Sequence, residues 1–222
     1  MNDGSVVAAF FDVDRTLLSV NSGEIWVRHL WRTGRLPLSE AARMLRWILQ
    51  YRLGFLDFEA VTARAVQDYA GRDYAEVAAE VKAWFDAELA TTITEGGRAR
   101  IEEHRRQGHR VALLTTGTRF VAEPLALLLA IPPEDILCTE FEVEAGHLTG
   151  RHLPPACGGP GKVARAEGYA ERWSLSLERS FFYTDSYSDV PMLSRVGHPR
   201  VINPDRRLRR YARKCEWEIE IW

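Results

Sequence analysis

Long apolar runs are missing from this chain of 222 residues. No stretch of about 18 consecutive apolar residues occurs, which excludes a conventional membrane-spanning helix. The N-terminus is polar and acidic, and the apolar run that follows it is too short for the core of a signal peptide. We therefore expect a soluble protein of the cytoplasm.

Cysteine and surplus positive charge are also scarce. The three cysteines, Cys138, Cys157 and Cys215, lie far apart and form no C-x-x-C pair. Neither a disulfide framework nor a cysteine metal cage is expected. A net charge of −2 lacks the basic surplus that is typical of nucleic-acid-binding proteins, so we expect no nucleic-acid partner.

The chain does contain a regular alternation of short apolar runs and helix-like stretches. Continuous apolar runs are typical of strands buried on both faces of a parallel sheet. Their alternation with helices predicts β-α units and an α/β fold with a doubly wound, mostly parallel sheet. The predicted strands are Val6–Val13, Arg110–Thr115, Ser180–Thr184 and Pro199–Ile202, and the predicted helices between them are Gly96–Gln107, Arg119–Ala130 and Gly161–Trp173. A small hairpin, Glu140–Val143 with His147–Thr149, is expected after the second β-α unit.

The segment from residue 21 to residue 90 breaks this alternation. It contains three or four predicted helices, which are Ser22–Arg32, Ser39–Tyr51, Phe58–Tyr69 and Tyr74–Leu89. Asp57 and Asp73 are candidate N-caps, and Glu76 follows Asp73 at the spacing of a capping box. So long a helical block cannot be a simple crossover. We predict a helical cap, residues 21–90, inserted into an α/β core, residues 1–20 and 91–222.

Two carboxylates end the first predicted strand. Asp12 and Asp14 lie two residues apart, a spacing that places both side chains on one face of a regular strand. The carboxyl ends of strands are where open α/β sheets have their binding sites. Taken alone, the pair fits a solvated strand end with turn-forming aspartates better than it fits a site.

Two further motifs have phosphate-binding chemistry. The second predicted strand runs into Thr115 and Thr116, where hydroxyls and free backbone N–H groups before a helix form a seat for phosphate. Lys162 follows a glycine-rich run, and its compact cation suits a phosphate oxygen. Ordinary helix capping by Thr118 and a plain surface lysine are the alternative interpretations.

A second acidic pair, Asp185 and Asp189, follows the strand at Ser180–Thr184. Magnesium prefers oxygen ligands and usually takes one or two carboxylates. Asp12 and Asp185, at the ends of neighbouring strands, are suited to supply them.

In this order the motifs resemble those of the haloacid-dehalogenase-like hydrolase superfamily. The family pattern consists of D-x-D-x-T, a strand-ending Ser or Thr, a Lys and a late acidic pair, which match Asp12–Thr16, Thr115, Lys162, and Asp185 with Asp189. The chain is most similar to the phosphoserine-phosphatase-like branch, which carries its helical cap between the first two motifs. Residues 184–193 also resemble the G-D-S-x-x-D-x-P-x-L of that branch.

The resemblance implies a Rossmann-like core and a magnesium-dependent hydrolase of small phosphomonoesters. Asp12 would be the nucleophile that forms an aspartyl-phosphate, and Asp14 would be the general acid and then the base. The other implied roles are phosphate binding by Thr115, Thr116 and Lys162, magnesium binding by Asp12, Asp185 and the backbone carbonyl of Asp14, and support from Thr16 and Asp189.

Three positions depart from the family pattern. Arg15 replaces a frequent glycine, and Thr184 stands where glycine usually precedes the metal-binding aspartate. Asn21 stands where phosphoserine phosphatases carry a glutamate, with Glu24 one helical turn further on. This last difference argues against phosphoserine itself, and an amino-alcohol phosphate or a lipid phosphate would fit.

Other functions remain open at this stage. A phosphotransferase or mutase would use the same motifs, and a phosphate-binding homologue without activity would keep the fold. A signalling receiver domain also surrounds an aspartate with acids, Thr and Lys, but it is about half this length and lacks a cap. Residues 25–55 hold six arginines against Glu40 alone, together with three tryptophans. This basic aromatic stretch fits either contact with a membrane surface or an aromatic cap core with a solvated basic face, and the second interpretation explains it better.

Overall fold

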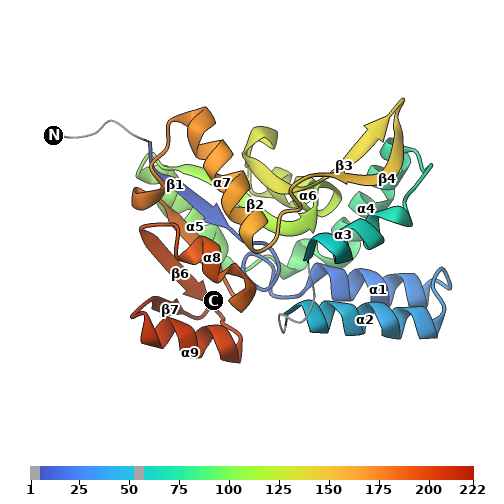
Figure 1. The fold of residues 1–222 in the computed structure, drawn as a ribbon, viewed down its shortest axis with the longest axis horizontal. Helices are drawn as coiled ribbons and strands as arrows, with labels where there is room; N and C mark the ends of the chain where they lie inside the picture. The colour runs from blue at the N-terminus through green and yellow to red at the C-terminus, as the bar shows by residue number, and fades with distance from the viewer. Residues whose placement is uncertain (1–5, 53–57) are drawn as a thin grey trace.

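A computed structural model describes residues 6–52 and 58–222. Its seven strands form one sheet in the order β4-β3-β2-β1-β5-β6-β7 (Figure 1). The strands are β1 (Ala8–Phe11), β2 (Arg110–Thr118), β3 (Ile136–Glu144), β4 (His147–Leu153), β5 (Phe181–Thr184), β6 (His198–Ile202) and β7 (Glu218–Glu220). All neighbouring pairs are parallel except β3 and β4. The predicted α/β class is confirmed.

The central strand β1 is buried on both faces, which explains its continuous apolar sequence. Ala9 and Phe11 belong to a core that includes residues of α4 (Tyr74–Glu88), α5 (Glu95–Arg106) and α6 (Arg119–Leu128). Ala8 and Phe10 belong to a second core with residues of α7 (Pro160–Trp173), α8 (Val190–Leu193) and α9 (Arg206–Lys214). Helices therefore cover both faces, as a doubly wound sheet requires.

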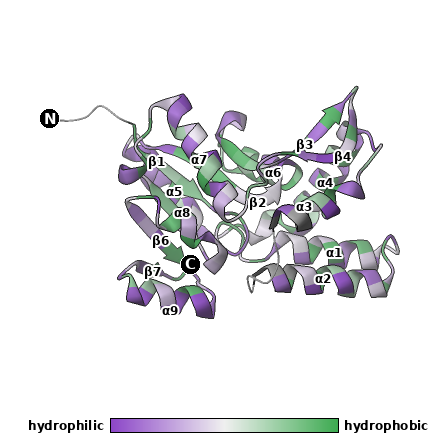
Figure 2. Cartoon of the chain, in the orientation of Figure 1, coloured by the Kyte–Doolittle hydropathy of each residue, from purple (hydrophilic) through white to green (hydrophobic). Residues whose placement is uncertain are grey.

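The predicted hairpin is part of the main sheet. Strands β3 and β4 are longer than expected and join at Ala145 and Gly146, both with positive φ, while β3 also pairs in parallel with β2. The prediction of a small insertion was wrong, because the polar residues of β3 concealed a strand whose first half is buried. Strand β7 and helix α9 were not predicted, since E-I-E is too short and R-R-L-R-R-Y-A-R-K too polar to stand out. Figure 2 shows these hydrophilic residues over much of α9.

Four helices lie between β1 and α5, as expected: α1 (Ser22–Arg32), α2 (Leu38–Arg52), α3 (Phe58–Gln67) and α4. Asp73 caps α4 by accepting from the Glu76 backbone N–H at 2.9 Å, which confirms that prediction, whereas Asp57 lies outside the described residues. The loop between α3 and α4 forms hydrogen bonds with the β3–β4 hairpin, and in one of them Gly71 N donates to Leu148 O at 2.8 Å. Helices α3 and α4 are therefore held against this edge of the sheet.

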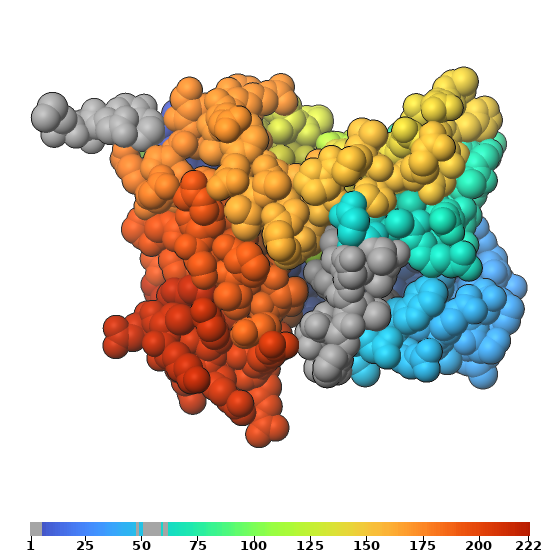
Figure 3. All heavy atoms as spheres, in the orientation of Figure 1, coloured from blue at the N-terminus to red at the C-terminus, as the bar shows by residue number. Residues whose placement is uncertain are grey.

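Several aromatic and basic side chains of residues 21–90 contact other side chains of the same segment. The Trp26 ring packs edge-on against Trp84 with centroids 4.8 Å apart, and Arg35 and Arg72 both pair with Glu80. In Figure 3 the surface of α1 and α2 lies at the lower right, away from the C-terminal segment at the lower left. Within residues 6–52 and 58–222, we find no helix with the length and hydrophobicity needed to cross a membrane.

Candidate active site

The predicted site residues meet at the carboxyl edge of the sheet. Strand β1 lies between β2 and β5, with Phe11 paired to Leu113 on one side and to Tyr183 on the other. The residues that follow these three strands therefore share one edge. Six predicted residues line a single cavity of about 40 Å³ there: Asp12, Asp14, Thr116, Lys162, Asp185 and Asp189.

A fully buried lysine is at the centre of this cluster. The Nζ of Lys162 lies 2.7 Å from Asp189 Oδ2 and 3.0 Å from Asp12 Oδ1. Burial alone would lower the pKa of Lys162, but the two carboxylates outweigh it and hold the pKa above its ordinary value. Lys162 is therefore a permanent cation beside Asp12.

Asp12 is buried in an environment that disfavours its charge. Burial, and to a lesser degree the negative charges of Asp189 and Asp14, raise its pKa to about 7 against the opposing effect of Lys162. Its Oδ1 lies within ion-pair distance of Lys162 yet makes no hydrogen bond with any described residue, because the contact is poorly directed. An added positive charge here would favour the ionised carboxylate.

Asp14 is held by the first turn of α1. Its Oδ1 accepts from the Ser22 backbone N–H at 2.8 Å, and its Oδ2 lies 3.3 Å from the donor Asn21 Nδ2. Burial raises the pKa of Asp14 despite these hydrogen bonds. The side chain of Asn21 also caps α1 through the Glu24 backbone N–H at 2.9 Å.

Asn21 is a site residue whose role the sequence did not reveal. It was noted only as a departure from the family, although Asn three residues before Glu24 is a helix-start signal. As an N-cap it fixes the start of α1, and that in turn brings Ser22 N to Asp14.

The predicted threonines occupy different positions. Thr116 lines the cavity, whereas Thr115 is buried and its hydroxyl accepts from the Gly117 backbone N–H at 3.0 Å. The hydroxyl of Thr16, which the resemblance implies as a supporting group, makes no hydrogen bond with a described residue. Instead, backbone groups close this loop, and the Thr94 hydroxyl donates to Thr16 O at 3.1 Å. Thr118 precedes α6 but forms no side-chain cap.

The cavity has oxygen donors suited to a hard divalent cation. Across the described part of the chain, no three His, Cys, Asp or Glu side chains form a metal cluster. Two carboxylates, Asp12 and Asp185, together with the main-chain carbonyl of Asp14, are the predicted ligands, and magnesium completes such partial sets with water. Asp12 Oδ1 fits this arrangement, because it accepts no hydrogen bond from a described residue and its lone pairs remain available beside the ion pair with Lys162.

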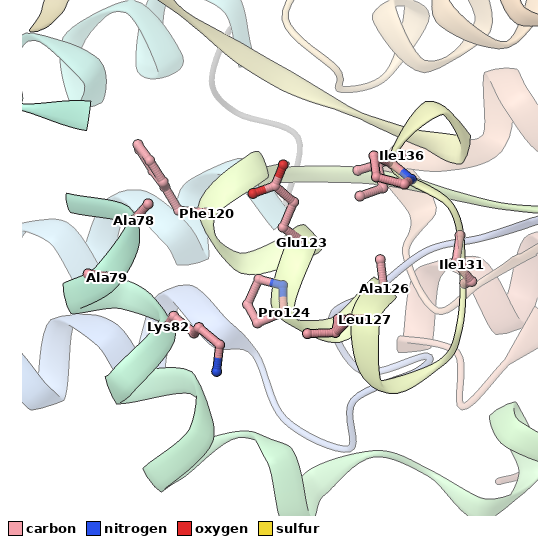
Figure 4. Close-up of a pocket in the computed structure, with 11 residues that line it drawn as sticks. Ala78, Ala79, Lys82, Phe120, Glu123, Pro124, Ala126, Leu127, Ile131 and Ile136 are labelled. Carbon is pink, nitrogen blue, oxygen red and sulfur yellow. The ribbon is translucent and has the colours of Figure 1, made fainter. Parts of the chain in front are cut away.

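A second cavity, of about 400 Å³, lies between α4 and α6 (Figure 4). It is mainly apolar, and its polar residues include Lys82 and Glu123. It contains none of the predicted site residues.

Comparison with known proteins identifies relatives that match nearly the whole chain. A family model of haloacid dehalogenase-like hydrolases matches residues 9–194. A Mycobacterium tuberculosis protein named phosphoserine phosphatase SerB1 is 35% identical over 96% of this chain and 70% of its own length. A Neisseria meningitidis protein named histidinol-phosphatase is 26% identical over 95% of this chain and 96% of its own length.

The fold is also found among solved structures. A Bordetella pertussis protein described as having unknown function superposes with a TM-score of 0.85 at 29% identity, over 97% of this chain and 98% of its own. The match therefore includes the helices between β1 and α5. The chain belongs to the haloacid dehalogenase-like hydrolase family, in the branch of phosphatases similar to phosphoserine phosphatase.

Proposed function

We propose that this protein hydrolyses small phosphomonoesters through an aspartyl-phosphate on Asp12, with Mg²⁺ as its cofactor. The observation that carries the proposal is the contact between Asp12, at the end of β1, and the fully buried Lys162 at 3.0 Å. A carboxylate nucleophile beside a permanent cation is suited to attack a group that is itself anionic.

In the first step a carboxylate oxygen of Asp12 attacks the phosphorus of the ester. The bond between phosphorus and the ester oxygen breaks, and that oxygen leaves with a proton from Asp14. The raised pKa of Asp14 supports this role, because a carboxyl group that keeps its proton near neutral pH is a better general acid.

In the second step a water molecule attacks the phosphorus of the aspartyl-phosphate. Asp14, now ionised, accepts the proton of that water, and the Asp12 carboxylate is released together with inorganic phosphate. The hydrogen bonds from Ser22 N and Asn21 keep Asp14 aimed at the cavity in both steps. In this proposal the Lys162 ammonium and the Thr116 hydroxyl hold the phosphate oxygens, which the presence of both residues in the cavity lining supports, and Thr115 orders the backbone beside them.

The bound cation would be held by Asp12, Asp185 and the backbone carbonyl of Asp14. When bound, it supplies positive charge that lowers the pKa of Asp12 and offsets the charge on the phosphate. The raised pKa of Asp12 in the protein alone supports the need for this charge, because only the ionised carboxylate attacks.

We further propose that α1–α4, residues 21–90, act as the cap that selects the substrate. Arg15 and Asn21 line the cavity, and Arg15 pairs with Glu24 of α1 at 3.0 Å. Phosphoserine and histidinol phosphate, in the names of two relatives, both carry an amino group near a phosphate ester. We therefore favour an amino-alcohol phosphate over a lipid phosphate.

Phosphate release from a panel of phosphomonoesters tests this function. The panel contains phosphoserine, histidinol phosphate, phosphoethanolamine and a short-chain lipid phosphate, each with and without Mg²⁺. We expect magnesium-dependent turnover that Asp12→Asn abolishes. Asp86→Asn is the matched control, because Asp86 is half-exposed on α4 and pairs with Lys82 one helical turn away.

Turnover that survives in Asp12→Asn would remove Asp12 as the nucleophile. Failure of the wild-type protein on every ester would leave phosphate binding without catalysis as the better interpretation. Product analysis in the presence of alcohols separates hydrolysis from transfer, because a phosphotransferase would yield a new ester.

A further inference from the structure

Thr184 is the last residue of β5 and has no solvent exposure. Because Phe11 is paired with Tyr183, the next residues along the two strands, Asp12 and Thr184, lie side by side. The Thr184 hydroxyl is 3.4 Å from Asp12 Oδ2 and 2.6 Å from Asp189 Oδ2. A threonine at this position therefore adds a polar group in the interior of the acidic cluster.

The single hydroxyl proton can satisfy only one of these carboxylates fully. An ionised carboxylate only accepts hydrogen bonds, so the hydroxyl donates to Asp189, the nearer partner. The 3.4 Å contact to Asp12 is too long for a strong hydrogen bond. Asp189 Oδ2 therefore receives two donors, the hydroxyl and the Lys162 ammonium at 2.7 Å.

The oxygen of the same hydroxyl also accepts a hydrogen bond from the backbone. It accepts from the Ser186 backbone N–H at 3.3 Å, which spans Asp185 in the manner of a Ser/Thr turn. Thr184 thus connects the backbone around Asp185 to the carboxylate of Asp189. Both ends of this connection face the cavity.

We propose that Thr184 is a positioning residue that acts through Asp189 to hold the Lys162 ammonium against Asp12. This inference rests on the proposed function, and it assigns to Thr184 a role in addition to those of the predicted site residues. Two donors on one oxygen fix the orientation of the Asp189 carboxylate. A fixed carboxylate in turn fixes Nζ, which has no other ion-pair partner among the described residues than Asp12 and Asp189.

Thr184→Ala and Thr184→Ser form the matched pair that tests this role. Both variants lack the threonine methyl group, so they differ only in the hydroxyl. With the best ester and saturating Mg²⁺, we expect kcat/KM of Thr184→Ala to be about tenfold below that of Thr184→Ser, because ~1 Å of misplacement at a reacting centre has large effects. Competitive inhibition by inorganic phosphate should weaken by a similar factor, and Thr184→Ser should stay within about threefold of wild type. Equal kcat/KM and equal phosphate inhibition in the two variants would overturn the proposal.

A double-mutant cycle tests the contact without any substrate. The unfolding equilibrium constant in urea should rise about tenfold from Thr184→Ser to Thr184→Ala, since a hydrogen bond to a charged group is lost. In an Asp189→Ala background, which removes the acceptor, the same exchange should change the unfolding equilibrium constant by less than about threefold. An equal change in both backgrounds would overturn the action through Asp189. This cycle does not depend on turnover. It therefore still shows whether the hydroxyl of Thr184 interacts with Asp189, even if no ester is hydrolysed and the proposed function fails.

Discussion

Gly161 provides a sharp test of how Lys162 is brought into the site. A methyl group at Gly161 would place its carbon 1.9 Å from the carbonyl oxygen of Ala156 and 3.1 Å from the carbonyl carbon. Gly161 also donates its backbone N–H to Gly158 O at 2.9 Å, so the turn before α7 is already closed. Gly161→Ala therefore forces the backbone of this turn or of α7 to move.

The required movement is more than about 1 Å, because carbon and oxygen atoms that do not bond rarely approach below ~3 Å. Overpacking of this kind destabilises a protein by about 1–3 kcal/mol, and contact with backbone favours the upper end of that range. With a urea m-value of about 2 kcal/mol/M, the midpoint of unfolding should fall by roughly 1–1.5 M. Because Lys162 is the next residue, we also expect kcat/KM to fall by at least about tenfold.

Gly168→Ala is the matched control, since Gly168 lies in the same helix and an added methyl group there meets nothing within 4 Å. Alanine is a better helix former, so this variant should gain about 0.5–1 kcal/mol and keep its activity. Urea unfolding followed by circular dichroism, together with phosphate release, measures both effects. If Gly161→Ala were as stable and as active as Gly168→Ala, the close approach to Ala156 would not position Lys162.

Three further predictions address other parts of the molecule. Lys162→Met should lose turnover and about 3 kcal/mol of unfolding free energy, because it leaves the buried Asp12 and Asp189 without a cation; unchanged urea stability would contradict this. Burial, followed by the charge of His109, lowers the pKa of His104 from 6.5 to about 4. The neutral imidazole of His104 is therefore favoured in the folded state. The stability that the protein gains from keeping His104 neutral is fully present above pH ~6.5 and is lost as the pH falls towards ~4. Urea unfolding at pH 7 and pH 5 should therefore show a smaller decrease for His104→Gln than for wild type, and an equal decrease would refute the assignment. Tyr169→Phe removes a hydroxyl 2.6 Å from Asp135 Oδ1, remote from the site, and should cost about 1 kcal/mol in thermal or urea unfolding with activity unchanged; a loss of turnover would contradict the separation of these regions.

The sequence predicted those parts of the fold that depend on local pattern. The apolar run before Asp12 identified β1, and the capping spacing of Asp73 identified the start of α4. The role of β3 could not be predicted, because its pairing with β2 depends on partners more than 20 residues away. Boundaries that depend on such pairing, including the end of β2 at Thr118, were the least accurate.

Within the site, the residue types were predictable but their contacts were not. Asp14 was recognised as a site residue. The hydrogen bonds that it accepts from Asn21 and Ser22 could not be predicted, because they depend on where α1 begins. Thr115 and Thr116 could not be distinguished from the sequence, because the strand pairing becomes irregular after Leu114 and a regular alternation no longer tells which of the two lines the cavity. Thr184 was recognised only as a departure, because its two carboxylate neighbours come from positions 12 and 189.

The central place of β1 has a consequence for synthesis on the ribosome. Phe11 pairs with Leu113 of β2 and with Tyr183 of β5, so both neighbouring strands are present only after residue 183 has been synthesised. At roughly 5–20 residues per second, the second partner emerges about 9–35 seconds after the first strand. During that interval the A-A-F-F strand has an open edge that can pair with other nascent chains, and Asp12, the proposed nucleophile, has no complete site around it. The protein therefore cannot act on phosphate esters until synthesis has passed β5, and its need for chaperones should be greatest before that point.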